Sequence, residues 1–489
     1  MRVFIFGIGG TGSRVLRSLT MLLASGIKLK QEGLTLVPVV IDSDAHNGDT
    51  ARTRDLLRNY YTIRQSFVNR TANSQSDIFF NTEIRSFSRL EKESTEAADI
   101  NVQLNFQNQD TSFANFINHN GLSEENKDII ELFYNDSIDE FPELHLNLNV
   151  GFKGNPNIGS VVFNDLKNSQ QFKNIESSFT ANDRVFIISS IFGGTGSAGF
   201  PTLVKLIRTS GNNNLATCKI GAITVMPYFN IESKDSSAIN SAIFDTKTKA
   251  ALSFYASDSH INSINALYYI ADNNQSGSLP NIEGGSDQKN DGHVVEFISA
   301  TSIVDFINKS SAELETPACY EFGAEKGESP MSIGHFGVDT KEKYIKSLLR
   351  FAYSCQIAKT IIPTLSNSTF YKPDELDIAN HLGIQNEYNK ILTFFSEFMQ
   401  WCSIEMTSTN NGRAFYTFNF DSHEHLNTLV YGKTIETGFL KPGLSKKVIS
   451  ERLTKNALGF EANTPRGEKY LRMLYKTSQD CLEKFGQLP

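Results

Sequence analysis

The sequence predicts an α/β fold built around a mostly parallel sheet, followed by a smaller, mostly helical α+β region. Continuous apolar runs are typical of strands that are buried on both faces of a parallel sheet. The chain has such runs at 3–6, 34–41, 185–188, 220–225 and 266–271. A glycine-rich turn follows the first and the third of these runs and leads into a helical pattern, which is the order of a strand–loop–helix unit.

Composition indicates a soluble globular protein large enough for two or three domains. The chain has 489 residues, of which 39% are hydrophobic and 20% charged, and its formal net charge is -8. An acidic balance argues against nucleic acid as the main partner. The five cysteines are scattered, without the spacing of a disulfide framework or a metal site, so we expect a reducing, cytoplasmic compartment. We expect neither a targeting signal nor a membrane span, because no apolar window has the required length.

The first strand–loop–helix unit begins at the N-terminus, with the apolar strand at 3–6. A helix is predicted over 14–25, and the loop before it contributes Gly9, Gly10, Thr11, Gly12 and Ser13. Glycines have no Cβ atom, so backbone N–H groups can approach an anion, and a helix N-terminus favours negative charge. We therefore expect these five loop residues to contact phosphate.

The next apolar run, 34–41, ends in Asp42, Ser43 and Asp44. Folds of this class bind ligands at the carboxyl ends of their parallel strands, so these three residues join the candidate site. Pro38 inside the run argues against a central strand, because proline lacks the N–H group that a strand ladder needs.

The second glycine-rich loop follows the strand at 185–188 and precedes a helical pattern that starts near 200. Its residues are Gly193, Gly194, Thr195, Gly196 and Ser197. Small residues combined with hydroxyl donors again suit a phosphate. The loop is not a P-loop, because no lysine follows, and it is not a dinucleotide fingerprint in the usual first-strand position.

Residues 1–44 taken alone allow a different interpretation. They can form a Rossmann-type unit that binds NAD, or the adenylating unit of an ATP-dependent, ubiquitin-activating-like enzyme. An acidic residue of the second strand would then bind ribose. The second glycine-rich loop weighs against this interpretation, because neither of those folds requires it.

Taken in order, the loops resemble those of the tubulin/FtsZ superfamily. Gly-Gly-Thr-Gly-Ser at 193–197 is similar to its signature loop, 7–13 matches the first nucleotide loop of the FtsZ family, and 42–45 matches the second. The resemblance covers roughly residues 1–310 and implies a Rossmann-like GTPase domain of tubulin/FtsZ type that binds GTP or GDP with Mg²⁺. Asp42 stands where FtsZ has Asn, and the added negative charge favours a bound cation.

Further motifs extend the resemblance. Asn-Pro-Asn-Ile-Gly at 155–159 resembles the third loop, so the resemblance implies that Gly154 and Asn155 contact the γ-phosphate. Glu232 matches a ribose contact and Asn273 a base contact. The family opens its central helix with an asparagine that is displaced here, and Asn290 is the candidate substitute. His293 is expected to start the helix by hydrogen bonding rather than to act as a catalyst.

No catalytic residue is assigned. FtsZ carries Asn-x-Asp-x-x-Asp after the central helix, and this sequence lacks that motif. Hydrolysis is therefore slow or lost, or the acid comes from another position. The resemblance implies head-to-tail self-assembly into filaments, and the alternative is a GTP-dependent switch that acts on a partner without polymerising. The biological role stays open, because one fold serves many roles.

The predicted organisation has three parts. Residues 1–290 form the nucleotide-binding domain, in which 46–150 are a polar surface insertion. Residues 291–310 form the central helix, and 311–489 form the C-terminal domain. Helical patterns dominate this last part, with one strand predicted at 413–420. The insertion and the C-terminal helices are the candidate surfaces for a protein partner.

Overall fold

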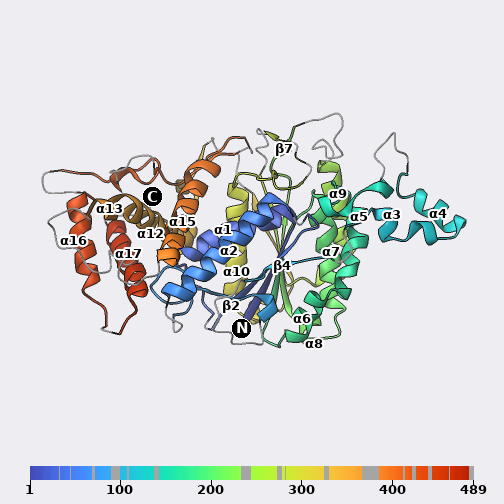
Figure 1. Cartoon of the computed structure of the whole chain (residues 1–489), viewed down its shortest axis with the longest axis horizontal. Helices are drawn as coiled ribbons and strands as arrows, with labels where there is room; N and C mark the ends of the chain where they lie inside the picture. The colour runs from blue at the N-terminus through green and yellow to red at the C-terminus, as the bar shows by residue number, and fades with distance from the viewer. Residues whose placement is uncertain are drawn as a thin grey trace.

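A parallel sheet of eight strands runs through the middle of the molecule (Figure 1). The computed structural model describes residues 1–31, 33–44, 46–68, 72–89, 100–106, 110–136, 143–232, 244–272, 278–280, 282, 284–323, 330–365, 385–410, 413–420, 426–438, 443–461 and 463–483. The strand order is β10-β8-β6-β5-β1-β2-β3, and β4 also pairs with β2. The strands are β1 (Arg2–Ile8), β2 (Thr35–Ile41), β3 (Glu83–Ile84), β4 (Gln103–Leu104), β5 (Arg184–Ser190), β6 (Lys219–Val225), β8 (Ala266–Ala271) and β10 (Ala318–Gly323).

The apolar runs of the sequence form the strands predicted for them. Every residue of β2 and β5 is buried, and β1 and β6 are buried except at their first residues. Burial on both faces explains why these strands are apolar without alternation. The first and third runs are neighbours, because β1 pairs in parallel with β5.

Pro38 lies inside β2, and the pairing of β2 shows how the sheet accommodates it. β2 pairs with β1 along its whole length, whereas two short strands share its other edge. On that edge Leu36 accepts a hydrogen bond from Arg85 at 2.9 Å, and Val40 donates one to Val102 at 2.6 Å. Alternate residues of a strand point their backbone groups to the same side, so the Pro38 nitrogen faces the gap between β3 and β4. The central strand that Pro38 argued against is therefore present, and no ladder bond is lost.

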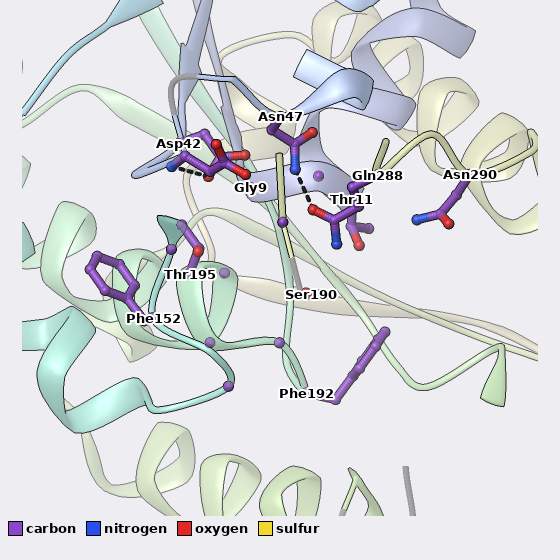
Figure 2. Close-up of a pocket in the computed structure, with 18 of the residues that line it drawn as sticks. Gly9, Thr11, Asp42, Asn47, Phe152, Ser190, Phe192, Thr195, Gln288 and Asn290 are labelled. Carbon is purple, nitrogen blue, oxygen red and sulfur yellow. Dashed lines mark hydrogen bonds between the residues drawn. The ribbon is translucent and has the colours of Figure 1, made fainter. Parts of the chain in front are cut away.

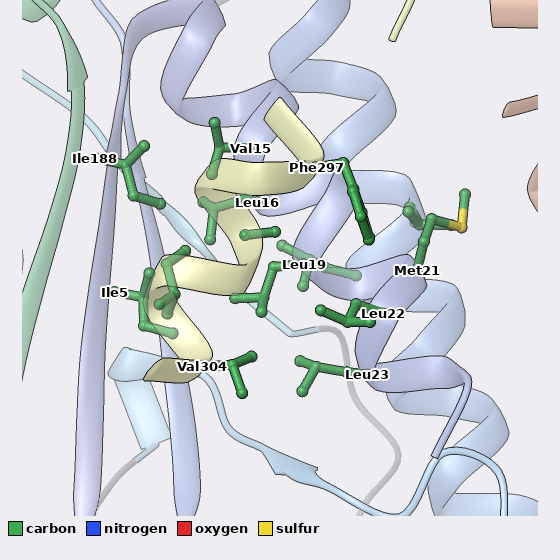
Figure 3. Packing of buried hydrophobic residues seen from close by; sticks show 14 of the residues in the cluster. Ile5, Val15, Leu16, Leu19, Met21, Leu22, Leu23, Ile188, Phe297 and Val304 are labelled. Atoms are coloured by element: carbon green, nitrogen blue, oxygen red, sulfur yellow. The ribbon is translucent and has the colours of Figure 1, made fainter. Parts of the chain in front are cut away.

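Helices cover both faces of the sheet. α1 (Gly9–Ala24), α2 (Gly48–Phe67) and α10 (Val294–Asn308) lie on one side, and α5 (Pro156–Phe163), α6 (Gln170–Ser178) and α7 (Gly194–Arg208) lie on the other (Figure 1). On the α1 side, Leu16 and Leu19 lie among Ile5 of β1 and Phe297 and Val304 of α10 (Figure 3). These five side chains are at most 2% exposed, so the predicted central helix, α10, packs into the main core.

The segment 46–150 is only in part the surface insertion predicted for it. α2 packs against α1, and β3 and β4 extend the sheet. The polar composition of α2 hides one apolar stripe, in which Leu56, Tyr60 and Ile63 recur at helical spacing and are buried. By contrast, α3 (Phe113–Phe116) and α4 (Glu124–Glu131) lie away from the sheet, beyond α5 (Figure 1).

The described part of the C-terminal region consists mostly of helices and packs on α1 and α2. Its longer helices are α12 (Lys346–Gln356), α15 (Gln385–Gln400), α16 (Lys446–Ala457) and α17 (Arg466–Leu482). Its strands differ from the prediction, because β10 is the edge strand of the main sheet. The strand predicted at 413–420 is reduced to β12 (Phe415–Tyr416), whose partner β11 (Met331–Ser332) is equally short.

The described fold has a few further α-helices and strands. They are α8 (Asn213–Ala216), α9 (Phe244–Ser257), α11 (Val338–Thr340), α13 (Ile362–Leu365), β7 (Asn230–Ile231) and β9 (Ser278–Leu279). Phe200 of α7 and Tyr255 of α9 pack edge to face with ring centroids 5.2 Å apart, so α9 lies against α7. Within the described ranges, no helix combines the length and the apolar character that crossing a membrane requires.

Candidate functional site

The carboxyl ends of β1 and β5 meet at one pocket, at the point where the strand order reverses. From β1 the sheet continues through β2 and β3 to one edge, and from β5 it continues through β6, β8 and β10 to the other. Open α/β sheets bind ligands in the crevice at such a reversal. Ile8 and Ser190, the last residues of the two strands, both line the pocket, and Figure 2 shows Ser190 there.

α1 begins at Gly9, directly at the pocket, whereas the sequence predicts a start at residue 14. The N-cap residue Ile8 provides no side-chain hydrogen bond, and Gly9, Gly10 and Thr11 line the pocket. Gly9 has a φ of 68°, in the left-handed region that glycine adopts without strain. The glycines predicted to form a loop are therefore the first turn of the helix, and its first backbone N–H groups lie at the pocket.

α7 places a second helix N-terminus at the same pocket. It begins at Gly194, and its N-cap residue Gly193 has no side chain that can cap it. Both glycines line the pocket together with Thr195 and Gly196. The two helix starts touch, since a Cβ atom built on Gly9 would lie 3.3 Å from the Cβ atom of Thr195. Two sets of N-terminal N–H groups therefore face one cavity.

The loop 151–154 forms a further wall of the pocket and has an unusual backbone. Gly151, Lys153 and Gly154 have φ values of 87°, 43° and 79°. The lysine is the strained member of this set, because a side chain disfavours the left-handed region. A Cβ atom on Gly194 would lie 2.8 Å from the backbone nitrogen of Gly154, so the loop packs directly on the start of α7. Phe152 lines the pocket from the same loop (Figure 2).

Two buried carboxyl groups, those of Asp42 and Asp44, follow β2 at the pocket. Asp42 accepts hydrogen bonds from the Asp44 N–H at 3.1 Å and from the Thr50 hydroxyl at 3.2 Å. Asp44 accepts one from the Gly285 N–H at 2.6 Å. Burial raises the pKa of Asp42 to about 7, and the charges of Asp44 and Asp49 add to the effect. A ligand in this pocket therefore meets a carboxyl group that titrates near neutral pH.

The structure brings most of the predicted site residues together at this pocket. Those that line it are Gly9, Gly10, Thr11, Asp42, Asp44, Gly154, Gly193, Gly194, Thr195, Gly196 and Asn290. Those outside its lining are Gly12, Ser13, Ser43, Asn155, Ser197 and Glu232. Asn273 lies outside the described residues.

Gly12 and Ser13 have structural contacts instead of pocket contacts. A Cβ atom on Gly12 would lie 2.6 Å from the carbonyl carbon of Gly7, so this glycine lets α1 pack closely on β1. The Ser13 hydroxyl lies 3.1 Å from the Thr50 hydroxyl, on the side of α2. Ser43 is fully buried between the two aspartates that line the pocket.

The side chains of Ser197 and Asn155 form hydrogen bonds with backbone groups at the starts of α7 and α5. The Ser197 hydroxyl donates to the carbonyl oxygen of Gly193, one turn earlier. The Asn155 carboxamide oxygen accepts hydrogen bonds from the N–H groups of Asn157 and Ile158, at 3.1 and 3.3 Å, and so caps α5. Glycine-rich and Asn-Pro segments supply both helix caps and ligand contacts, and the sequence alone does not separate these roles.

Several polar residues at the pocket carry no motif in the sequence. They are Arg14, Asn47, Lys153, Lys247 and Gln288. The Asn47 Nδ2 atom donates to the Gln288 Oε1 atom at 2.5 Å, which joins the start of α2 to the segment after β9 (Figure 2). A single polar residue on a helix or in a loop has no spacing pattern, so no sequence signal marks these positions.

Aromatic rings form an apolar wall beside the helix starts. The Phe192 ring lies 5.4 Å from the Phe229 ring and 5.0 Å from the Phe244 ring, measured between centroids, and all three residues line the pocket. Glu232, by contrast, is exposed, whereas its neighbour Ile231 lines the pocket. Apolar walls with a few convergent polar groups are typical of small-molecule sites.

Arg14 is a cation at the pocket whose charge is balanced inside the protein. Its guanidinium lies 2.6 Å from Asp49 Oδ2 and 2.5 Å from Glu296 Oε1, and it donates to the Tyr228 hydroxyl at 2.9 Å. All four side chains are buried. The Asn290 N–H donates to Asp49 at 3.1 Å, so the pocket residue Asn290 is held by the same network.

His293 is the N-cap of α10, which confirms the helix-start role expected for it. Its Nδ1 atom accepts from the Val295 N–H at 3.1 Å, and the Glu296 carboxylate accepts from the His293 N–H at 3.1 Å. Burial lowers the pKa of His293 to about 4, so the ring is neutral at pH 7.

No protein-family model and no curated protein matches the chain. One similar solved structure is CetZ2 from Haloferax volcanii in a GTPγS-bound protofilament, with 11% identity and a TM-score of 0.29 over 64% of this chain and 59% of that chain. Another is TubZ-Bt in a two-stranded filament, with 10% identity and a TM-score of 0.22 over 81% of this chain and 78% of that chain. The chain thus covers less than two thirds of CetZ2. Likeness at this level does not establish a family, so the chemistry of the site rests on the geometry described above.

Proposed function

We propose that the chain binds a guanine nucleotide in this pocket, with its phosphates against the N-termini of α1 and α7. The observation that carries the proposal is the convergence of these two helix starts, neither capped by a side chain, at the carboxyl ends of β1 and β5. The first N–H groups of a helix lack acceptors within the helix, and the helix dipole adds positive charge there. The oxygens of a polyphosphate satisfy both requirements.

The glycines at the helix starts suit close contact between backbone and ligand. Gly9, Gly193 and Gly194 all line the pocket, so no side chain covers the N–H groups at these positions. A dinucleotide needs only one such helix start for its pyrophosphate. The second start, that of α7, therefore favours a nucleoside polyphosphate over NAD.

The resemblance of the loops to the tubulin/FtsZ superfamily favours guanine as the base, and Asn290 is the described residue that suits it. A carboxamide donates and accepts hydrogen bonds at once, which matches the edge of guanine. Figure 2 shows Asn290 on the opposite side of the pocket from Phe152 and Thr195. The base would therefore lie at one end of the pocket and the phosphates would extend toward the other.

We propose that Mg²⁺ binds together with the nucleotide and is held chiefly by the phosphates. In the part of the chain that the structure describes, no group of three His, Cys, Asp or Glu side chains can hold a metal ion. Asp42 is the pocket residue that fits a supporting role, because a nearby Mg²⁺ would stabilise its charged form. The ion would neutralise phosphate charge.

Calorimetric titration of the full chain with GTP, GDP, ATP and NAD, each with Mg²⁺, tests the proposal. We expect guanine nucleotides to bind at least about tenfold more tightly than ATP or NAD. Preferential binding of NAD or ATP would support the Rossmann-type enzyme instead. Absence of binding by all four ligands would refute the proposal.

On the resemblance of the loops alone, we also propose that copies of the chain assemble head to tail and hydrolyse GTP between subunits. Phosphate release from GTP should then be absent below a threshold protein concentration and rise above it. Sedimentation with GTP tests assembly even where hydrolysis is slow. A chain that binds GTP and stays monomeric at every concentration is the non-polymerising switch.

A further inference from the structure

Lys247 of α9 is a pocket cation without a carboxylate partner among the residues that the structure describes. Its side chain is partly buried, and its Nζ atom donates to the carbonyl oxygen of Gly154 at 2.7 Å. Arg14, at the same pocket, differs in this respect, because two carboxylates balance its charge. Lys247 therefore contributes positive charge that no described carboxylate pairs with directly.

The surroundings of Lys247 make an anion the natural complement. Burial lowers the pKa of Lys247, because the ammonium group loses water on one side. The helix starts of α1 and α7 add positive potential in the same cavity. An ammonium group has three N–H donors, and the Gly154 carbonyl takes one of them. The remaining donors can serve the oxygens of a bound phosphate.

The position of Lys247 indicates which phosphate it meets. Its partner Gly154 packs on Gly194 at the start of α7. Phe152, from the same loop as Gly154, and Asn290 lie at opposite sides of the pocket in Figure 2. A nucleotide with its base at Asn290 and its phosphates at the helix starts therefore directs its last phosphate toward this loop.

We propose that Lys247 binds the terminal phosphate of a nucleoside triphosphate and makes the pocket prefer the triphosphate over the diphosphate. This inference rests on the proposed function. The Nζ atom would exchange part of its contact with the Gly154 carbonyl for phosphate oxygens. Bonds between two charged groups are stronger than bonds to a neutral carbonyl, so the exchange is favourable.

Calorimetric titration of GTP and GDP into the full chain and into the Lys247→Gln variant tests this inference. Glutamine keeps a neutral donor for Gly154 and removes the charge. The matched control is Lys249→Gln, which changes an exposed lysine of the same helix. We expect Lys247→Gln to weaken GTP about tenfold or more and GDP less than about threefold. The control should change neither affinity, and Lys247→Arg should retain most of the preference for GTP.

Equal losses of GTP and GDP affinity would overturn the inference, because they would place Lys247 at an inner phosphate. Unchanged affinities would overturn it by removing Lys247 from the site. In both cases the wild-type chain still binds nucleotide, so the proposed function stands. If circular dichroism shows that Lys247→Gln does not fold, the affinities of the wild-type chain for GTP and GDP test the inference instead. Equal affinities for the two nucleotides contradict it. A wild-type chain that binds neither nucleotide refutes the proposed function and the inference together.

Discussion

Gly194 packs so closely on Gly154 that a Cβ atom on Gly194 would lie 2.8 Å from the Gly154 backbone nitrogen. The start of α7 and the loop 151–154 therefore form one packed unit. Gly9 adds the start of α1 to this unit, since its own Cβ atom would lie 3.3 Å from Thr195. Three segments that are far apart in the sequence converge on one cavity because glycine permits the approach.

Replacing Gly194 with valine should weaken GTP binding and also destabilise the fold. The added side chain meets the Gly154 backbone and covers the first N–H groups of α7, so we expect GTP affinity to fall by more than about tenfold. The overpacking should cost about 1–3 kcal/mol of unfolding free energy. Calorimetry and urea unfolding measure the two effects. Gly211→Ala is the control, because a Cβ atom there meets nothing within 4 Å, and undiminished GTP affinity in Gly194→Val would contradict the phosphate assignment.

Asp42→Asn should remove a pH dependence of stability that lies below neutral pH. The folded pKa of Asp42 is about 7, above its ordinary value of 3.8, because the group is buried. Between these two values the folded chain holds a proton that the unfolded chain releases, so the wild-type free energy of unfolding falls as pH rises. Over the pH range between the two pKa values, the free energy of unfolding falls by about 4 kcal/mol at most.

Urea unfolding of both proteins at pH 4, 5.5 and 7.5 measures this effect. Asparagine can still accept from the Asp44 N–H and contact the Thr50 hydroxyl, so the local fold should persist. We expect wild-type stability to fall relative to Asp42→Asn from pH 4 to pH 7.5. Parallel curves for the two proteins would show that Asp42 has an ordinary pKa in the folded state.

His293→Asn should remove a second pH dependence of stability, which has the opposite sign to that of Asp42: His293 makes the wild-type chain less stable as pH falls. Burial lowers the folded pKa of His293 to about 4 from 6.5, so the unfolded chain holds the extra proton between these values. Wild-type stability is therefore lost as pH falls from 6.5 to 4, by about 3 kcal/mol at most. Asparagine keeps an N-cap acceptor for α10 and does not titrate.

The same unfolding series compares wild type, His293→Asn and His293→Ala. At pH 7.5 we expect His293→Asn to be closer to wild type than His293→Ala, which should lose about 1 kcal/mol or more with the cap. Below pH 6 the asparagine variant should lose less stability than wild type does. An equal loss in both would assign the acid sensitivity to other groups.

The main strands could be predicted because burial on both faces requires continuous apolar residues, as in β2 and β5. β3 and β4 could not, since two residues are too short to show a period. The sequence of α2 shows a helical pattern only near residues 55–62, because its buried stripe is narrow and the rest of the helix is polar or charged. The start of α1 at Gly9 was missed for a different reason: glycines are disfavoured in helices, and here their contacts with neighbouring segments outweigh that preference.

The candidate site shows the same division. Glycines after the strands β1 and β5 indicated the helix starts at the pocket. The position of Asp42 and Asp44 directly after the apolar run of β2 indicated that they belong to the site. Asn155 and Ser197 carried the same signals, yet they cap or bond to their own helices. Lys247 and Asn47 reach the pocket only through the tertiary packing of α9 and α2, which no local pattern encodes.

Arg17 of α1 and Glu405, which follows α15, form a buried ion pair that ties the C-terminal region to the main core. Arg17 is 7% exposed and Glu405 is 2% exposed, and one of their contacts is 2.9 Å long. Glu405 also accepts from the Gly292 N–H at 3.2 Å, just before α10 begins. The pair therefore fixes the C-terminal region to the segment that carries Asn290 into the pocket.

Arg17→Met should destabilise the chain by about 3 kcal/mol at pH 7, because it leaves a buried carboxylate without its main partner. Lys346→Met breaks the exposed helical pair with Glu342 and should cost less than about 0.5 kcal/mol. Burial alone would raise the pKa of Glu405, but the hydrogen bond and the charge of Arg17, together with the charge of Arg52 and the Gly292 N–H, outweigh burial and lower the pKa below 4.5. The stability from this pair is thus present above pH 4.5 and is lost as pH falls through the folded pKa. Urea unfolding at pH 7 and pH 3.5 should show the cost of Arg17→Met shrinking with acid, and equal costs for the two variants at pH 7 would show that the buried pair adds no more than a surface pair.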